Sequence, residues 1–165
     1  MRYLFLLRHA NAPASKPDKK RMLDEKGINQ ARAVGIYLSR QPQIDLIKLS
    51  DATRTKQTFN QLTKTLGYTP ESQETSSLYN VTPEQILKEV LETNDNVSNL
   101  MIIGHNPSIM MVAQLLNINM EAKWISSIFE SQPAAKVTVI KSEADSWQSF
   151  TKFNNQIMDI YWPEQ

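Results

Sequence analysis

The sequence predicts an α/β fold, a three-layer α/β/α arrangement with a mainly parallel central sheet and an antiparallel edge. Short, continuously apolar runs alternate with longer segments of helical periodicity as far as Leu116, which is the order of strand–helix–strand units with right-handed crossovers. Beyond Leu116, segments of alternating polarity joined by short turns favour antiparallel strands. The 165 residues contain no internal repeat and no linker, so we expect one domain over residues 1–165.

The first strand and the first helix are well marked. Tyr3–Leu7 is an apolar run typical of a strand buried on both faces. Residues 11–21 hold two prolines, one aspartate and three lysines, which indicates a loop. Asp24 is the predicted N-cap of a helix whose apolar face recurs to Leu38. Gln41-Pro42 ends that helix.

A second strand, a second helix and a third helix follow. Ile44–Leu49 predicts the strand, and a helix begins at about Thr53 and stops at Gly67. Thr69–Val81 is ambiguous between a short edge strand and loops. The segment Thr82-Pro83-Glu84-Gln85 fits a capping box with proline at the first helical position, so it predicts the start of the third helix.

The remaining segments predict one more buried strand, an apolar helix and the antiparallel edge. Leu100–Ile103 is the strand, and Asn106-Pro107 opens a helix that runs to Leu116. The predicted antiparallel pair consists of Lys136–Ile140 and Trp147–Phe153, and the chain ends in a closing strand or a tail over Ile157–Trp162.

Composition excludes several classes of function. Eighteen Lys+Arg against seventeen Asp+Glu give a formal charge of +1, which does not favour nucleic acid or an anionic membrane as a partner. With no Cys, thiolate catalysis and thiolate metal sites are excluded, and two His cannot form a His-rich metal site. The first apolar run ends at Leu7 and no later run is long enough to span a bilayer, so we expect a cytoplasmic protein.

Polar side chains follow three of the predicted strands, and these include both histidines of the chain. Arg8-His9 follows the first strand, Ser50 and Arg54 follow the second, and Gly104-His105-Asn106-Pro107 follows Leu100–Ile103. Ligands of such sheets bind beyond the carboxyl ends of the strands. Each group alone fits a helix cap, a solvated side chain or a structural histidine, but together they favour one binding site.

These residue types suit phosphoryl transfer. Arginine offers a planar, permanently charged fork for two phosphate oxygens, and a neutral imidazole can attack phosphorus to form a phosphohistidine. The helix N-termini after Ser50 and Asn106 would direct further donors at a dianion. Arg8 beside His9 would disfavour the imidazolium, so that a nitrogen lone pair is available near neutral pH.

The pattern resembles the histidine phosphatase superfamily, also called phosphoglycerate-mutase-like. Leu7-Arg8-His9-Ala10 is similar to the family's N-terminal Arg-His motif, and Gly104-His105 to its C-terminal Gly-His block. Two further motifs match in part. The Ser-Pro-x-x-Arg-Ala-x-Gln-Thr motif is matched by Ser50, Arg54, Gln57 and Thr58, with Asp51 and Thr55 replacing its Pro and Ala. The Arg-x-Leu-Ser/Thr-x-x-Gly motif is matched by Arg21, Leu23 and Gly27, with Asp24 in the cap position.

The resemblance implies a role for each residue. His9 would be the nucleophile that becomes phosphorylated, and Arg8, Arg54 and His105 would surround the phosphoryl group. Arg21 would be an additional contact, and Ser50 and Asn106 would support the site or offer backbone donors. The resemblance implies no metal and no organic cofactor, and it implies that a phosphate- or sulfate-like anion binds among these residues.

One departure from the family pattern narrows the substrate class. Many members carry a mid-chain Glu that protonates an oxygen leaving group, whereas this chain reads Leu78-Tyr79-Asn80-Val81-Thr82 there. Asp18, Glu74 and Glu84 are the alternative donors. A phosphohistidine ring protonated on its far nitrogen leaves as neutral imidazole and needs less help. The chain therefore resembles the SixA-type subgroup, which acts on phosphohistidine in proteins.

Chain length is consistent with a protein substrate. The loops Ser15–Arg21 and Glu71–Thr82 are too small to close a lid over a metabolite. Two alternatives stay open: a small-molecule phosphomonoesterase or mutase of the same superfamily, and a phosphate-binding module without turnover. Trp124, Phe129 and Trp162 could belong to the core or to a docking surface, and we expect the core.

Overall fold

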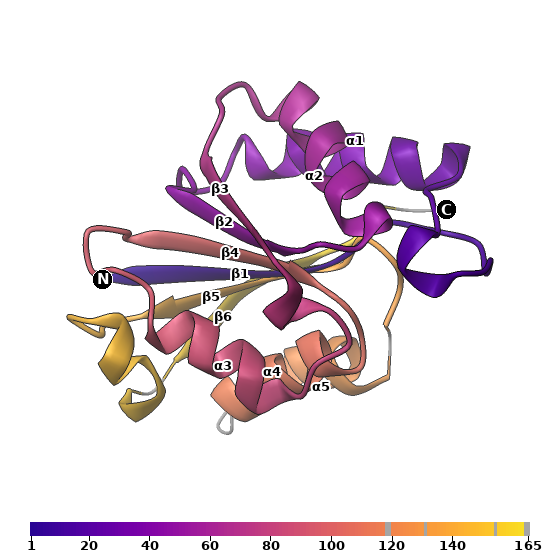
Figure 1. Ribbon diagram of the computed structural model, residues 1–165. Helices are drawn as coiled ribbons and strands as arrows, with labels where there is room; N and C mark the ends of the chain where they lie inside the picture. The colour runs from indigo at the N-terminus through magenta and orange to yellow at the C-terminus, as the bar shows by residue number, and fades with distance from the viewer. Residues whose placement is uncertain (118–119, 131, 154, 164–165) are drawn as a thin grey trace.

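A computed structural model describes residues 1–117, 120–130, 132–153 and 155–163 and places a six-stranded sheet between two layers of helices (Figure 1). The sheet order is β3-β2-β4-β1-β5-β6. The pairs β1/β4, β2/β4 and β2/β3 are parallel, whereas β5 pairs antiparallel with β1 and β6 pairs antiparallel with β5. The predicted fold class is confirmed. The strands are β1 (Arg2–Arg8), β2 (Leu46–Ser50), β3 (Glu71–Thr75), β4 (Asn99–Gly104), β5 (Val137–Ser142) and β6 (Gln156–Tyr161).

Helices cover both faces of the sheet (Figure 1). Alternate residues of β1 explain the two layers: Phe5 and Leu7 belong to one buried cluster and Leu4 and Leu6 to the other. The first face carries α1 (Glu25–Leu38) and α2 (Thr53–Leu66); the second carries α3 (Pro83–Leu91), α4 (Ser108–Leu116) and α5 (Ala122–Phe129).

The helix boundaries follow the predicted caps. The Asp24 carboxylate accepts a hydrogen bond from the Gly27 amide at 2.8 Å and so begins α1. The Thr82 hydroxyl accepts from the Gln85 amide at the start of α3. Gly67 ends α2 with φ +86°, a left-handed conformation that glycine adopts without steric cost.

The prediction of a strand over Trp147–Phe153 is wrong. Residues Trp147–Lys152 form a 3-10 helix, η3, and β6 is the strand that pairs with β5. Trp147 and Phe150 are both fully buried and their rings stack at 5.2 Å, a spacing of three residues that one turn of 3-10 helix satisfies. The closing segment, predicted as a strand or a tail over Ile157–Trp162, forms the strand β6. The helix α5 has no counterpart among the predicted elements.

The ambiguous segment and the aromatic residues are also settled by the fold. Thr69–Val81 contains the edge strand β3 and a short 3-10 helix, η2 (Ser76–Leu78). Trp124 and Trp162 are partly buried, but Phe129 is 53% exposed, so the expectation of a core position is wrong for Phe129. Among the described residues, no helix has both the length and the apolar character needed to cross a bilayer.

Strand register brings the predicted polar residues to one edge. Arg8 lies opposite Gly104 in the β1/β4 pair, and Leu49 lies opposite Ile103 in the β2/β4 pair. Because these three neighbouring strands are parallel, the residues that follow them leave the sheet side by side. The candidate site therefore lies at the carboxyl edge of β2, β4 and β1.

Candidate active site

The imidazole of His9 lies at the centre of this edge, and the residue is 7% exposed. Its Nδ1 is 2.8 Å from the Ala10 carbonyl oxygen. Because a carbonyl oxygen only accepts hydrogen bonds, Nδ1 must carry the proton. Nε2 then holds the lone pair, and it accepts a hydrogen bond from Arg54 Nε at 3.2 Å. The unprotonated nitrogen therefore faces the guanidinium group.

Burial keeps His9 neutral. It is the largest cause that lowers the pKa of His9 to about 3, and the charges of His105, Arg54 and Arg8 lower it further. The hydrogen bond to the Ala10 carbonyl acts in the opposite direction. The sequence predicted a contribution from Arg8, and the structure adds the larger contribution of desolvation.

The second histidine lies beside the first, with the ring centroids of His9 and His105 5.2 Å apart. Arg54 Nη2 lies 3.2 Å from His105 Nδ1, and since a guanidinium only donates, Nδ1 is the acceptor. His105 Nε2 then carries the proton and donates to Ser50 Oγ at 2.8 Å. Burial, followed by the Arg54 charge, lowers the pKa of His105 to about 4.

Arg54 joins the two imidazoles. It lies in the first turn of α2 and is 5% exposed. Besides the two ring nitrogens, it donates from Nη1 to the Asp18 carbonyl oxygen at 2.9 Å, and Nη2 lies 3.3 Å from Asp18 Oδ2. One buried guanidinium thus contacts both histidines and the loop that follows β1.

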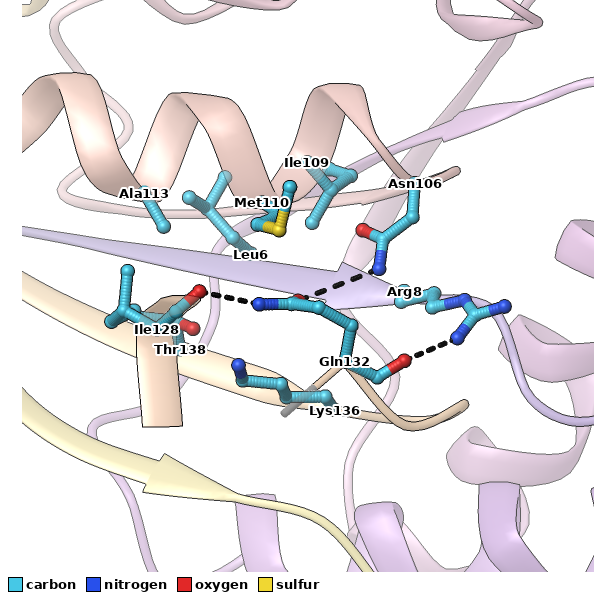
Figure 2. Close-up of a pocket in the computed structure, with 10 residues that line it drawn as sticks. All are labelled: Leu6, Arg8, Asn106, Ile109, Met110, Ala113, Ile128, Gln132, Lys136 and Thr138. Atoms are coloured by element: carbon cyan, nitrogen blue, oxygen red, sulfur yellow. Dashed lines mark hydrogen bonds between the residues drawn. The ribbon is translucent and has the colours of Figure 1, made fainter. Parts of the chain in front are cut away.

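Arg8 is the last residue of β1, and Gln132 holds its side chain (Figure 2). An Arg8 Nη1 hydrogen bond to the Gln132 carbonyl fixes the guanidinium, and the Gln132 side chain accepts from Asn106 Nδ2 at 3.5 Å. Among the described residues, Arg8 Nε has no hydrogen-bond partner. The cavity behind Arg8 measures about 10 Å³, enough for one water molecule and too small for a ligand. Gln132, which the sequence analysis missed, therefore links two of the predicted residues.

The partly matched motifs hold the loop after β1 in place. The Ala10 amide donates to Thr58 Oγ1 at 3.0 Å, and Asn11 Nδ2 donates to Asp24 Oδ2 at 2.7 Å. A Cβ on Gly27 would lie 2.1 Å from the Asn11 carbonyl oxygen, so only glycine lets α1 approach the loop this closely. Thr58, Asp24 and Gly27 of the two partly matched motifs therefore act on the site by fixing the backbone around His9.

Asp18 and Tyr79 form the outer rim of the site. Tyr79 OH donates to Asp18 Oδ2 at 2.6 Å, and the Tyr79 ring meets the His105 ring edge-on at 5.6 Å. Arg21 Nη1 lies 3.0 Å from Asp18 Oδ1. The hydrogen bonds from Tyr79 and Arg21 are the largest causes that lower the pKa of Asp18 to about 2. Asp18 is therefore an anion at neutral pH.

A groove of about 310 Å³ continues from this edge between the N-terminal ends of α3 and α4. His105 and Asn106 line the end nearest the site, and the remaining lining is mostly apolar, with Leu78, Val81, Pro83, Ile86, Pro107 and Met111 among its residues. An elongated surface beside a buried polar centre leaves room for more than a phosphate group.

The structure gathers His9, Arg54, His105 and Ser50 into one hydrogen-bonded group, and Gln132 joins Arg8 to Asn106, which lines the same groove as His105. Arg21 does not touch either histidine; it donates to the Ala12 and Pro13 carbonyl oxygens and to Asp18. Of the three carboxylates considered as proton donors, only Asp18 lies near the histidines. Asp18 lies at the rim, whereas Glu74 pairs with Lys56 at 3.4 Å and Glu84 is exposed in the first turn of α3.

Tyr79 lies in the segment Leu78–Thr82, where the family resemblance implies an acid. It directly follows the 3-10 helix η2, and no sequence motif marks it. Across the described ranges, no group of three His, Asp or Glu side chains could hold a metal ion. The groups that the site does bring together are two imidazoles and the buried guanidinium of Arg54.

Comparisons with known proteins agree with this fold. The family model of the histidine phosphatase superfamily (branch 1) matches residues 4–78. A provisionally named phosphohistidine phosphatase SixA from Nakamurella multipartitia has a similar structure, with a TM-score of 0.84, 24% identity, and coverage of 98% of this chain and 96% of that chain. The protein histidine phosphatase SixA complexed with tungstate matches with a TM-score of 0.78 and 16% identity over 97% of this chain and 96% of that one.

A relative by sequence has no assigned activity. An uncharacterized protein of Mycobacterium tuberculosis is 29% identical over 140 residues, which cover 82% of this chain and 86% of that protein.

Proposed function

We propose that this chain is a phosphatase of the histidine phosphatase superfamily, whose family model matches residues 4–78, and that it hydrolyses phosphohistidine in proteins through a covalent intermediate on His9. The observation that carries the proposal is the pair of neutral imidazoles, 5.2 Å apart, that face one buried guanidinium. Arg8, Arg54 and His105 bind the phosphoryl group; Ser50 and Asn106 support them, and Arg21 holds the loop that closes the rim.

The first step transfers the phosphoryl group to His9. A phosphoryl oxygen accepts the hydrogen bond that Arg54 Nε now donates to His9 Nε2, and this releases the lone pair for attack. A bond forms between Nε2 and phosphorus while the bond to the leaving nitrogen breaks with its electron pair. Positive charge on the His9 ring is then stabilised by the Nδ1–H hydrogen bond to the Ala10 carbonyl.

The second step returns the enzyme to its resting state. Water attacks phosphorus, the bond between phosphorus and Nε2 breaks, and His9 leaves as a neutral imidazole with its proton still on Nδ1. The attacking water gives a proton to His105 Nδ1, whose lone pair now accepts from Arg54 Nη2, and His105 loses this proton to solvent as phosphate leaves. The guanidinium groups stabilise the charge on the equatorial oxygens in both steps.

The leaving group determines the choice of substrate. Within the described part of the chain, Asp18 is the carboxylate in hydrogen-bond contact with the core of the site, and it is ionised. An alkoxide is a poor leaving group without a proton donor, whereas a protonated phosphohistidine ring leaves as neutral imidazole. The groove beside His105 can accommodate protein groups around the phosphohistidine. The tungstate complex of the similar SixA protein also supports a site for a tetrahedral oxyanion.

Trapping the intermediate tests the proposal. The purified protein is mixed with a phosphohistidine-bearing phosphocarrier protein, quenched in alkali and analysed by peptide mass spectrometry. We expect an added phosphoryl group on His9, and no turnover from His9→Ala with an unchanged circular dichroism spectrum. An active His9→Ala variant would exclude the covalent mechanism. Faster hydrolysis of sugar phosphates or phosphoglycerate than of the phosphoprotein would instead favour a small-molecule phosphomonoesterase.

A second test concerns the guanidinium fork. Arg54→Lys should lower kcat/KM at least a hundredfold, because an ammonium group cannot reproduce the planar fork by which a guanidinium group holds two phosphate oxygens. Arg32→Lys is the matched control, since Arg32 binds Gln61 on the outer surface of α1 and α2. Equal kinetics for the two variants would count against direct phosphate contact by Arg54.

A further inference from the structure

We propose that Asp18 determines the specificity of this site for phosphoramidates: its carboxylate accepts a hydrogen bond from the far ring nitrogen of the substrate's phosphohistidine. The inference rests on the proposed phosphohistidine phosphatase activity. It assigns Asp18 a role opposite to that of a general acid, because here the residue keeps a proton on the leaving group without supplying one.

The position of Asp18 fits a contact with the leaving group. Its side chain is 54% exposed, whereas that of Arg54, which it contacts, is 6% exposed. His9 is buried behind the same guanidinium. His9 attacks a phosphoryl group bound between His9 and Asp18 from the buried side. Because the attacking and leaving atoms are in line, the leaving group must point toward solvent. Asp18 lies on that solvent side.

Asp18 also has a free site for one more donor. An ionised carboxylate offers about four lone-pair positions. Oδ2 accepts from Tyr79 OH and Arg54 Nη2, and Oδ1 accepts from Arg21 Nη1. Among the described residues one position on Oδ1 is therefore unused. The three donors also hold the carboxylate in one position, whereas an exposed side chain without such contacts would be free to rotate.

The charges around Asp18 exclude the role of proton donor. Tyr79 donates its hydroxyl proton to the carboxylate, and Arg21 and Arg54 carry permanent positive charge beside it. These groups favour the ionised carboxylate, and the pKa of Asp18 is lowered to about 2. At neutral pH the residue has no proton to give.

The chemistry balances without such a donor. The bond between phosphorus and the near nitrogen of the substrate ring breaks, and its electron pair stays on that nitrogen. The far nitrogen keeps its proton, hydrogen-bonded to Asp18, so the ring leaves as neutral imidazole. His9 uses the same arrangement when it is the leaving group, since its own far nitrogen, Nδ1, is held protonated by the Ala10 carbonyl at 2.8 Å.

The same carboxylate acts against oxygen leaving groups. A phosphomonoester develops negative charge on its leaving oxygen, which the Asp18 anion repels, whereas a protonated phosphohistidine ring is positive and is attracted. Asp18 therefore raises the rate for one substrate class and lowers it for the other.

Asp18→Asn tests this role with two small substrates, phosphoimidazole and p-nitrophenyl phosphate. Asparagine keeps the size and an acceptor oxygen but removes the charge. We expect kcat/KM for phosphoimidazole to fall about tenfold, the size of one charge-assisted hydrogen bond, and kcat/KM for p-nitrophenyl phosphate to stay the same or to rise. Tyr79→Phe, which removes one donor that orients Asp18, should lower the ratio of the two rates in the same direction by less.

The pH profile provides a readout that a structural role would not move. The Asp18 anion raises the pKa of the far nitrogen in the bound ring, so kcat for phosphoimidazole in Asp18→Asn should decline from a lower pH than in the wild type. Glu74→Gln is the matched control, because it also removes a half-exposed carboxylate from an ion pair. That variant should keep the wild-type ratio and profile.

The outcomes separate this inference from the proposed function. A wild-type protein that hydrolyses p-nitrophenyl phosphate but neither phosphoimidazole nor a phosphohistidine protein overturns the proposed function. A wild-type protein active on both, whose Asp18→Asn variant loses both activities equally, overturns only the role of Asp18. A larger loss on phenyl phosphate, which has a poor leaving group, than on phosphoimidazole would make Asp18 a general acid and also overturn it.

Discussion

Acid should destabilise this protein through the buried ring of His9. In the unfolded chain a histidine has a pKa of about 6.5, and burial lowers that of His9 to about 3 in the folded protein. Between these two values the unfolded state binds one more proton than the folded state. The free energy of unfolding therefore falls as the pH decreases from 6.5 toward 3, and it regains this contribution above pH 6.5.

The two pKa values give the size of the effect. At pH 5 almost every unfolded chain carries a proton on His9, which stabilises the unfolded state by about 2 kcal/mol relative to the neutral form. At pH 7 the same contribution is only about 0.2 kcal/mol. His9 alone should therefore remove about 2 kcal/mol, to order of magnitude, from the free energy of unfolding between pH 7 and pH 5.

Urea unfolding of the wild type and of His9→Asn at both pH values measures this contribution. Asparagine does not titrate, so the variant should lose about 2 kcal/mol less than the wild type on going from pH 7 to pH 5. His105, whose pKa is lowered to about 4, remains in both proteins and contributes equally. An identical pH dependence in the two proteins would refute a neutral, desolvated His9.

Two further perturbations separate the site from the scaffold. Gly27→Ala and Gly35→Ala each place a Cβ about 2 Å from a backbone carbonyl oxygen, so thermal or urea unfolding should show a free energy of unfolding lowered by about 1–3 kcal/mol in each. Only Gly27→Ala should also lower kcat, because Gly27 packs against the loop that follows the nucleophile. Equal activity in the two variants would refute that link. Ser50→Ala and Ser142→Ala each remove a buried hydroxyl that accepts an amide hydrogen bond at 3.2 Å, but only Ser50→Ala leaves His105 Nε2 without its acceptor. We therefore expect steady-state kcat to fall about tenfold in Ser50→Ala alone. An unchanged kcat would show that Ser50 does not orient the ring of His105.

Sequence patterns predicted the parts of the fold that local rules decide. Tyr3–Leu7 and Leu100–Ile103 are buried on both faces, so their apolar runs predicted β1 and β4 within two residues. The Asp24 and Thr82 caps are interactions over three residues and were equally visible. From the strands alone, the carboxyl-edge rule indicated that His9 and His105 would meet.

Long-range contacts decided the parts that the sequence left open. Gln132 lies 124 residues from Arg8, and Tyr79 lies 61 residues from Asp18, so no local pattern connects either pair. The segment Trp147–Lys152 alternates like a strand, but Trp147 Nε1 donates to the Val97 carbonyl at 2.7 Å and draws the segment into a helical turn against the core. In each case tertiary packing determined the outcome where local propensity was weak.

The groups behind the two imidazoles suggest why their roles differ. The partner of His9 is the Ala10 carbonyl, which only accepts hydrogen bonds, so His9 is fixed with its proton on Nδ1 and its lone pair on Nε2. The partner of His105 is the Ser50 hydroxyl, which can donate or accept. His105 can therefore gain or lose a proton at Nδ1, or exchange tautomers, without losing the Ser50 hydrogen bond, and a proton on Nδ1 replaces the hydrogen bond from Arg54 Nη2. A fixed lone pair suits a nucleophile, and an adaptable ring suits proton exchange with the attacking water. Replacing Ser50 by alanine would remove that adaptability while leaving the His9 lone pair in place, so the variant should still become phosphorylated but release phosphate slowly.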